Sequence, residues 1–249
     1  MNGFVKFLQC VACCCLLPGC LAVGTGWSKD VVEGQGARIA RSGSFADYDR
    51  LSVDVPVRIE IVRGTGWSYT ITGFENQLAL IEMKSSGGRL SVGSDRDDLH
   101  FPEDQPVLVE LTVPRSLAEI ELSSKALVEV HCAMEPSEMT VSLKDMASLS
   151  LDSLRVEVLR AELDDMSKLT VRGEAARFDG KVEDMSLAEL GAAVVGDACC
   201  RVEDMGKCRL RVKGVLDGEV SDMGRMTYRG EPSEVKVRVS DMGSLTKDR

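Results

Sequence analysis

The chain has few of the residues on which catalysis and sugar binding usually depend. Its 249 residues include two His, two Trp and three Tyr, and aromatic residues make up 4% of the total. No Ser-His-Asp or Cys-His arrangement can be read from the sequence. These shortages argue against nucleophilic catalysis and against an aromatic platform for sugars, and they predict a core of Val, Leu, Ala and Met.

The sequence also has no basic patch with interleaved aromatic residues. The formal net charge is −10; residues 1–20 contain one Lys and no acidic residue, so the rest carries 29 basic and 40 acidic side chains, a net charge of −11. An acidic surface repels nucleic acid and anionic membranes, and it attracts cations or basic partners. We therefore predict no nucleic-acid partner.

The apolar stretch at the N-terminus is too short to span a bilayer as a helix. Met1–Lys6 supplies one positive charge and Phe7–Leu17 is apolar, as in a signal peptide. The segment ends in Leu17-Pro18-Gly19-Cys20, which resembles a bacterial lipobox. The resemblance implies a signal peptide at residues 1–19, cleavage before Cys20 and attachment of lipid to the Cys20 sulfur. An ordinary cleaved signal is the alternative.

Residues 20–37 are Gly-rich and weakly patterned, so we predict a flexible tether between the lipid and the fold. A lipid on Cys20 makes the membrane a partner and places the chain in the cell envelope. Leu21-Ala22-Val23 contains no acidic, export-like run, which favours an outer-membrane lipoprotein facing the periplasm over one on the cell surface.

An Asp-Met pair recurs along the second half of the chain. The pairs are Asp145-Met146, Asp165-Met166, Asp184-Met185, Asp204-Met205, Asp222-Met223 and Asp241-Met242. Their Asp residues are 20, 19, 20, 18 and 19 residues apart. A fixed period of this length is typical of a solenoid, in which stacked units form one long body.

Apolar residues alternate with polar ones around each pair. Two positions before the Asp stand Leu143, Leu163, Val182, Val202, Val220 and Val239. Four positions after it stand Leu149, Leu169, Ala188, Cys208, Met226 and Leu245. A period of two indicates strands with one buried face. The alternation is too long for one straight strand, so we expect a bend near its middle. The small residues Ala147, Ser167, Ser186, Gly206, Gly224 and Gly243 are the expected cause of that bend.

These features predict an all-β parallel β-helix with about 19–20 residues per coil. At about 3.3 Å per residue the perimeter of a coil is about 60 Å, and neighbouring coils lie about 4.8 Å apart. The regular repeats occupy residues 118–247, and Leu122–Ala126 matches the Asp145 corner one coil earlier. Second breaks are expected at Gly173, Gly191, Gly214 and Gly230.

The upstream half is less regular but also strand-like. Expected strands are Arg50–Asp54, Val57–Val62, Tyr69–Thr72, Arg89–Val92 and Val107–Val113. Gly64–Gly66 and Ser85–Gly88 have the composition of hairpin turns. Glu75–Met83 is long enough for a helix of one or two turns.

The order of these segments resembles the auto-transporter adhesin, head GIN domain family. The resemblance covers about residues 38–247 and begins with Ser42-Gly43-Ser44-Phe45, Tyr48–Val53 and Val57–Ile61. Ser240–Leu245 is similar to the Ser-Gly-type turns of the family, although Asp-Met stands where Gly-Ser is commoner. The resemblance implies a right-handed β-helix, an exported protein and an adhesion-type role.

The stacked Asp and Met residues each allow two interpretations. Carboxylates in a row repel, so either each caps backbone N–H groups at its corner, which we favour, or the row binds divalent cations. The Met side chains either fill the core, which we also favour, or form an apolar stripe that marks a protein interface. The repeat residues are thus expected to be structural, and copper binding by the thioethers is disfavoured.

Four cysteines lie beyond the leader: Cys132, Cys199, Cys200 and Cys208. They form no CxxC pair, and neither His100 nor His131 has ligand-like neighbours apart from the adjacent His131-Cys132. We therefore predict no metal and no cofactor. Cys200 and Cys208 fall in columns of small or aliphatic residues, so we expect buried thiols, with the disulfide state open.

The sequence favours a non-catalytic binding or adhesion module that recognises a protein or glycan along one face of the coils. A structural periplasmic protein is the second interpretation, and its oligomeric state is open. A carbohydrate-active β-helix enzyme is the third; its acids would be expected to break the repeat, whereas here the acidic residues follow it.

Overall fold

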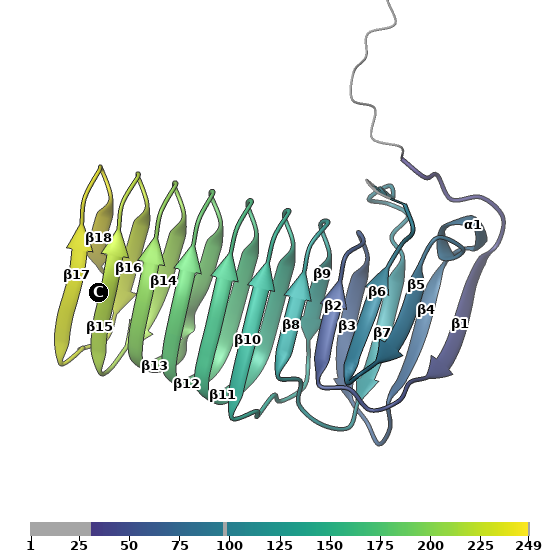
Figure 1. Cartoon of the computed structure of the whole chain (residues 1–249), viewed down its shortest axis with the longest axis horizontal. Coiled ribbons are helices and arrows are strands. Elements are labelled where there is room, and N and C mark those ends of the chain that lie inside the picture. The colour runs from purple at the N-terminus through teal and green to yellow at the C-terminus, as the bar shows by residue number, and fades with distance from the viewer. Residues whose placement is uncertain (1–30, 97–98, 249) are drawn as a thin grey trace, which may run out of the picture.

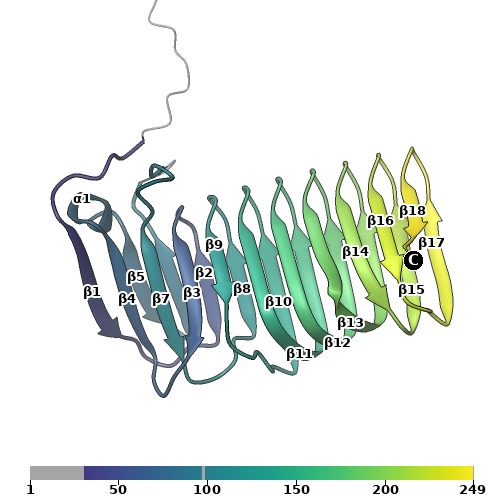
Figure 2. The ribbon, with the colours of Figure 1, turned by 180° about the vertical axis from the view of Figure 1, so that it is seen from behind.

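The chain forms an elongated β-solenoid, shown from its two sides in Figures 1 and 2. The computed structural model describes residues 31–96 and 99–248. Two sheets face each other across an apolar core, and each coil crosses from one sheet to the other. The prediction of an all-β parallel β-helix is confirmed. The predicted signal peptide and Cys20 lie outside the described residues.

The first sheet, called sheet 1, carries the strands that run towards the Asp-Met corners. In spatial order it contains β5 (Glu82–Ser86), β6 (Arg89–Gly93), β2 (Arg50–Val53), β8 (Glu119–Leu122), β10 (Glu138–Leu143), the second halves of β11 (Ser148–Leu163), β12 (Lys168–Val182) and β13 (Leu187–Val202), β15 (Val215–Val220) and β17 (Glu234–Val239). All pairings are parallel except that of β5 with β6.

The opposite sheet, called sheet 2, carries the strands that run away from the corners. It contains β1 (Arg38–Ser44), β4 (Ser68–Phe74), β7 (Leu108–Val113), β3 (Arg58–Arg63), β9 (Leu127–Val130), the first halves of β11, β12 and β13, β14 (Lys207–Val212), β16 (Arg225–Arg229) and β18 (Ser244–Lys247). Here β4 pairs antiparallel with both β1 and β7.

Like positions of successive coils lie side by side, as the repeat predicts. Leu143 pairs with Leu163, and the same column continues through Val182 and Val202 to Val220. These side chains are buried. Where a coil has a small inward residue, a neighbouring side chain fills the space: a Cβ on Gly180 would lie 2.4 Å from the ring of Phe178. The core is therefore filled column by column.

The N-terminal strands do not stack in sequence order. β2 lies between β6 and β8, and β3 lies between β7 and β9, so the first coil of the chain sits inside the stack. The expected hairpin at Gly64–Gly66 is wrong, because it joins β3 to β4 and these strands pair with other partners. The hairpin at Ser85–Gly88 is confirmed by the β5–β6 pair. α1 (Glu75–Leu78) is a single turn, within the expected range.

The N-terminal end of the solenoid is formed by elements outside the regular repeat. β1, β4, β5 and α1 cover it, and Phe45 and Tyr69 stack beside β1 with ring centroids 4.6 Å apart. Tyr48 and Trp67 add a second ring contact at 4.2 Å. Between residues 32 and 145, leaving out 97–98, no large hydrophobic side chain is exposed. The first residues described, from Val31, also lie against this end, since Val32 N–H donates to the His100 carbonyl.

No helix in the described part of the chain combines the length and apolar character needed to cross a membrane.

Gly173, one of the expected breaks, has a backbone that tolerates no side chain. Its φ is +122°, and an added Cβ would lie 2.0 Å from the carbonyl oxygen of Leu154 in the neighbouring coil. We expect Gly173→Ala to lower the free energy of unfolding by about 1–3 kcal/mol, measured by urea denaturation. Gly66→Ala is the control, because a Cβ there meets nothing within 4 Å. Equal effects of the two substitutions would contradict this reading.

Candidate binding surface

Each Asp-Met pair forms a tight two-residue turn that joins the two sheets. In all six pairs both residues have positive φ, 43–51° for Asp and 62–64° for Met. The residue after the Met donates its N–H to the carbonyl of the residue before the Asp, as from Ala147 to Lys144 at 3.0 Å. This is the geometry of a type I′ turn. Ser124-Lys125 adopts it too, with φ of 52° and 61°, which confirms the expected match to the Asp145 corner.

Hydrogen bonds between turns align the corners into one row. The Met N–H of each turn donates to the Asp carbonyl of the next, over distances of 2.8–3.2 Å, from Met146 to Asp165 and onward to Met223 and Asp241. The expectation that the aspartates line up is confirmed. We call the six Asp-Met turns the corner row; with five steps of about 4.8 Å it is about 24 Å long.

The small residue after each Met does not make the bend, contrary to expectation. Asp and Met themselves carry the positive φ, and the small residue lies behind the turn, buried in the first five coils and partly buried in the last. A Cβ on Gly206 would lie 2.4 Å from the carbonyl oxygen of Val182, so lack of space selects small side chains there. The constraint is therefore steric and involves no special backbone angle.

The Met side chains of the corner row point into solvent. Their exposed fractions are 40–51% for the first five and 80% for Met242. The expected burial of these residues is therefore wrong. The alternation that fixes in and out along a strand does not continue through a turn with two positive φ angles, so both Asp and Met face outwards.

The Asp carboxylates of the corner row are exposed and do not cap the backbone. Among the described residues none of the six accepts a backbone N–H, so the favoured capping role is wrong. Ligand atoms of Asp164, Asp165 and Asp184 lie within 4.8 Å of one another. A side-chain hydrogen bond with Asp164, partial desolvation and nearby carboxylates raise the pKa of Asp184 above its ordinary value of 3.8. The row is thus a line of mutually repelling charges.

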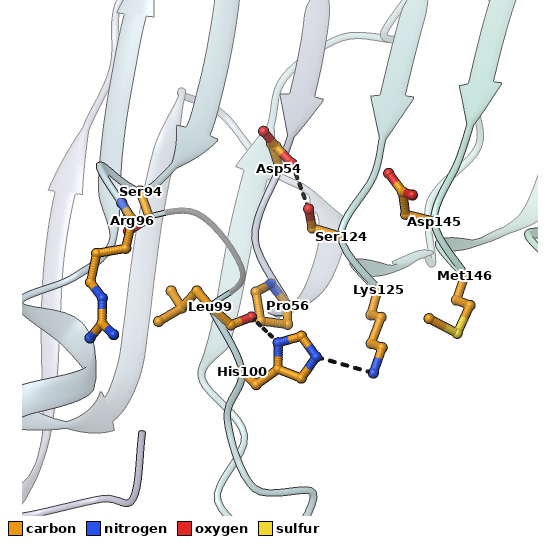
Figure 3. A pocket seen from close by; sticks show the side chains of 10 residues that line it. All are labelled: Asp54, Pro56, Ser94, Arg96, Leu99, His100, Ser124, Lys125, Asp145 and Met146. Atoms are coloured by element: carbon orange, nitrogen blue, oxygen red, sulfur yellow. Dashed lines mark hydrogen bonds between the residues drawn. The ribbon is translucent and has the colours of Figure 1, made fainter. Parts of the chain in front are cut away.

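A pocket of about 340 Å³ lies at the N-terminal end of the corner row. Figure 3 shows that Asp54, Ser124 and Asp145 point to one side of the corners, whereas Lys125 and Met146 point to the other. The Ser124 hydroxyl donates to Asp54 at 2.7 Å. On the Met side, Lys125 Nζ lies 3.4 Å from His100 Nε2. The corner row therefore has an acidic side and a Met side. At the N-terminal end of the row, the Met side carries the ammonium group of Lys125.

A second, shallower groove crosses the outer face of sheet 1 and has a volume of about 670 Å³. Charged side chains line it, and several already pair with neighbours: Arg177 with Asp179, Lys181 with Glu183, Arg201 with Glu203 and Lys236 with Glu234. No aromatic residue lines it. The groove has no stacking platform for a sugar ring.

The thiols are buried or poorly reactive. Cys200 and Cys208 are both buried with their sulfur atoms 3.4 Å apart, which confirms the expected buried thiols. Contact with the Cys200 thiol and burial raise the pKa of the Cys208 thiol. Burial raises the pKa of Cys132 and of Cys199 as well. A high thiol pKa leaves little of the nucleophilic thiolate.

Sequence reasoning missed the surroundings of His131. Its Nδ1 lies 3.0 Å from Asp152, and its ligand atoms lie within 4.8 Å of those of Glu60 and Glu129. The stacking of strands β3, β9 and β11 brings these residues together from distant parts of the sequence. Asp152 also pairs with Arg172 at 3.5 Å, so this cluster belongs to a network of surface ion pairs.

Fold and surface together define a class of protein: a β-solenoid that carries a row of exposed Met side chains along one edge of its coils. The model of the family described as putative auto-transporter adhesin, head GIN domain, matches residues 47–232, and the chain belongs to this family. The resemblance read from the sequence is confirmed. No curated protein matches the chain.

Solved structures share the fold at low sequence identity. A putative adhesin from Bacteroides fragilis has a TM-score of 0.80 and 14% identity over 87% of this chain and 100% of its own. A putative lipid binding protein from Parabacteroides distasonis has a TM-score of 0.71 and 14% identity over 88% and 99%. A putative adhesin from Parabacteroides merdae has a TM-score of 0.65 and 16% identity over 88% and 100%. The family supports an adhesion-type module associated with the cell envelope, and the solved structures support the fold.

The raised pKa of Asp184 predicts a pH-dependent stability. The folded chain holds this proton more tightly than the unfolded chain, so the stabilisation is complete below pH 3.8 and is lost as the pH rises through the raised pKa. Asp184→Asn removes the titration. We expect the melting temperature of the variant to exceed that of the parent by a margin that grows from acid to neutral pH. Asp145→Asn, outside the cluster around Asp164, is the control; a margin that stays constant with pH would contradict the prediction.

Proposed function

We propose that this chain is a non-catalytic, lipid-anchored binding module of the cell envelope that recognises a protein surface through its corner row. The observation that carries the proposal is the line of six exposed Met side chains held at positive φ. An outer-membrane anchor facing the periplasm is the orientation that the sequence after Cys20 favours.

Met at the second position of these turns lowers the stability of the fold. Left-handed backbone disfavours L-residues by about 1–2 kcal/mol each, and type I′ turns therefore prefer Gly at their second central position. This chain places Met there six times in succession. Because Gly would fold more readily, the repeated Met supports a role outside folding. Exposed Met is flexible and polarisable, and it is used at surfaces that bind other proteins.

The charges around the row indicate the kind of partner. The six Met side chains form a narrow line of exposed apolar groups along the corners. At the first Asp-Met corner, Asp145 points to the opposite side from Met146 (Figure 3). A partner that offers an apolar groove flanked by Lys or Arg complements both features. A glycan is less well matched, since no aromatic residue lines the groove on sheet 1.

The chemistry of the side chains supports a non-catalytic role. The thiols of Cys132, Cys199 and Cys208 have raised pKa values, which disfavours nucleophilic attack at neutral pH. His131 lies beside the carboxylates of Glu60, Glu129 and Asp152, and burial raises the pKa of the adjacent Cys132 thiol. The acidic residues follow the repeat, whereas an active site usually breaks it.

Replacing Met in the corner row by Gly is expected to raise stability and remove binding at the same time. Met185→Gly should increase the free energy of unfolding by about 1 kcal/mol because it relieves the left-handed strain. Replacing Met166, Met185, Met205 and Met223 together should abolish binding to a synthetic amphipathic Leu/Lys peptide, measured by calorimetry, while the melting temperature rises.

The matched control for this experiment is Lys125→Gly, which changes the same turn position outside the Met residues and should raise stability without loss of binding. A Leu/Glu peptide should not bind. Binding of the Leu/Lys peptide that survives the fourfold Met replacement would overturn the proposal. Release of sugars from a polysaccharide panel, lost on replacing one acidic residue, would instead establish the enzyme alternative, and the lack of any binding partner would favour a purely structural periplasmic role.

The lipid anchor is tested separately through Cys20. We expect the chain to sediment with membranes and to carry acyl groups detectable by mass spectrometry, because two or more buried acyl chains hold a protein stably at a bilayer. Cys20→Ser should release the chain into the soluble envelope fraction. Membrane association that persists in this variant would contradict the lipidation of Cys20.

A further inference from the structure

Two inward-facing thiols meet behind the Asp204-Met205 corner. Cys200 lies near the end of β13 in sheet 1, and Cys208 lies in β14 of sheet 2. Both side chains are 0% exposed, and their sulfur atoms are 3.4 Å apart. The corner thus brings one cysteine from each sheet into contact across the core.

No other coil among the described residues has cysteine at either of these two positions. In the neighbouring coils the equivalent positions hold small or apolar residues, which are Gly180, Gly218, Ala188 and Met226. Both columns therefore accept residues without a thiol, and packing alone does not require cysteine in either. The two cysteines occur together, in one coil, at the two positions that face each other.

We propose that Cys200 and Cys208 form a structural disulfide that joins the two sheets in the exported protein. Their sulfur atoms must approach by about 1.4 Å to reach the disulfide bond length of about 2.05 Å. Rotation of the Cys200 side chain supplies this movement, because Gly180 and Gly218 place no side chain beside it in its own column. The inference rests on the proposed function for the export of the chain, since disulfides form and persist in oxidising compartments.

The other two described cysteines are placed where they cannot take part. Cys199 lies on the outer face of sheet 1 between Asp179 and Asp217. Successive side chains of a strand point to opposite faces, so the Cys199 thiol points away from the core. Cys132 follows β9, which lies four strand steps, or about 19 Å, from β14 in sheet 2. The geometry therefore favours a single pairing.

Burial determines when the bond forms. Formation removes one hydrogen atom from each thiol, and the two electrons pass to a second disulfide, of a small molecule or an exchange protein, which becomes two thiols. In the folded, reduced chain, contact with the Cys200 thiol and burial raise the pKa of the Cys208 thiol, which leaves little thiolate for this exchange. We therefore expect the bond to form while the coils are still stacking, and burial then protects it from reduction.

The crosslink closes a short loop around one left-handed corner. Asp204 and Met205 have φ angles of 46° and 64°, which L-residues adopt at a cost in stability. A disulfide between the two strands that flank this corner restricts the unfolded chain and so favours the folded corner. The bond therefore stabilises the corner row near its middle.

The test maps the disulfide in the full chain isolated from the cell envelope. Free thiols are blocked in denaturant, and the chain is cleaved with trypsin without a reductant and analysed by mass spectrometry. We expect peptide 182–201, which carries Cys199 and Cys200, to be linked to peptide 208–209. Cys199→Ser should keep this link and Cys200→Ser should lose it, which assigns the bond to Cys200.

The stability of the refolded chain gives a second measurement. We expect the full chain refolded with oxidised glutathione to melt about 5–10 °C above the same chain refolded under reducing conditions. Cys208→Ala should remove this difference, and its fold should persist because Ala188 occupies the same position one coil earlier. Cys199→Ser is the matched control and should retain the full difference.

Three results would each overturn the proposal. These are blocked thiols at both Cys200 and Cys208 in a chain whose Cys20 carries lipid, a bond between Cys199 and Cys200, and a chain refolded with oxidised glutathione that lacks the link. A chain without lipid on Cys20 that still forms the link on refolding would contradict the anchor and support the disulfide. The two proposals can therefore fail independently.

Discussion

Hydrogen bonds between successive coils set most of the properties of this molecule. Each strand pairs with the equivalent strand of the next coil. At the corners, the Met N–H donates a hydrogen bond to the Asp carbonyl of the next coil. These hydrogen bonds hold the backbones of successive coils in the same conformation. Equivalent positions therefore have the same surroundings in every coil and hold similar residues. The columns of the core, the small residues behind the turns and the corner row are consequences of this constraint.

Features that recur in every coil could be predicted from the sequence. A period of 19–20 residues, the inward column at Leu163 and the alignment of the aspartates could all be read from spacing, because stacking converts spacing into position. The orientation of Asp and Met could not, since alternation holds only within strands. Only half of the signal was present: Asp is favoured at the first central position of a type I′ turn, whereas the second position holds Met where Gly is preferred.

Other features depended on contacts that no local pattern records. The place of β2 and β3 inside the stack follows from pairing with strands far along the chain, and spacing says nothing about which strand is adjacent. The acids around His131 meet for the same reason. The pocket beside Lys125 forms because His100 lies against the first regular corner. His100 is not part of the repeat, so the spacing of the repeat could not predict this contact.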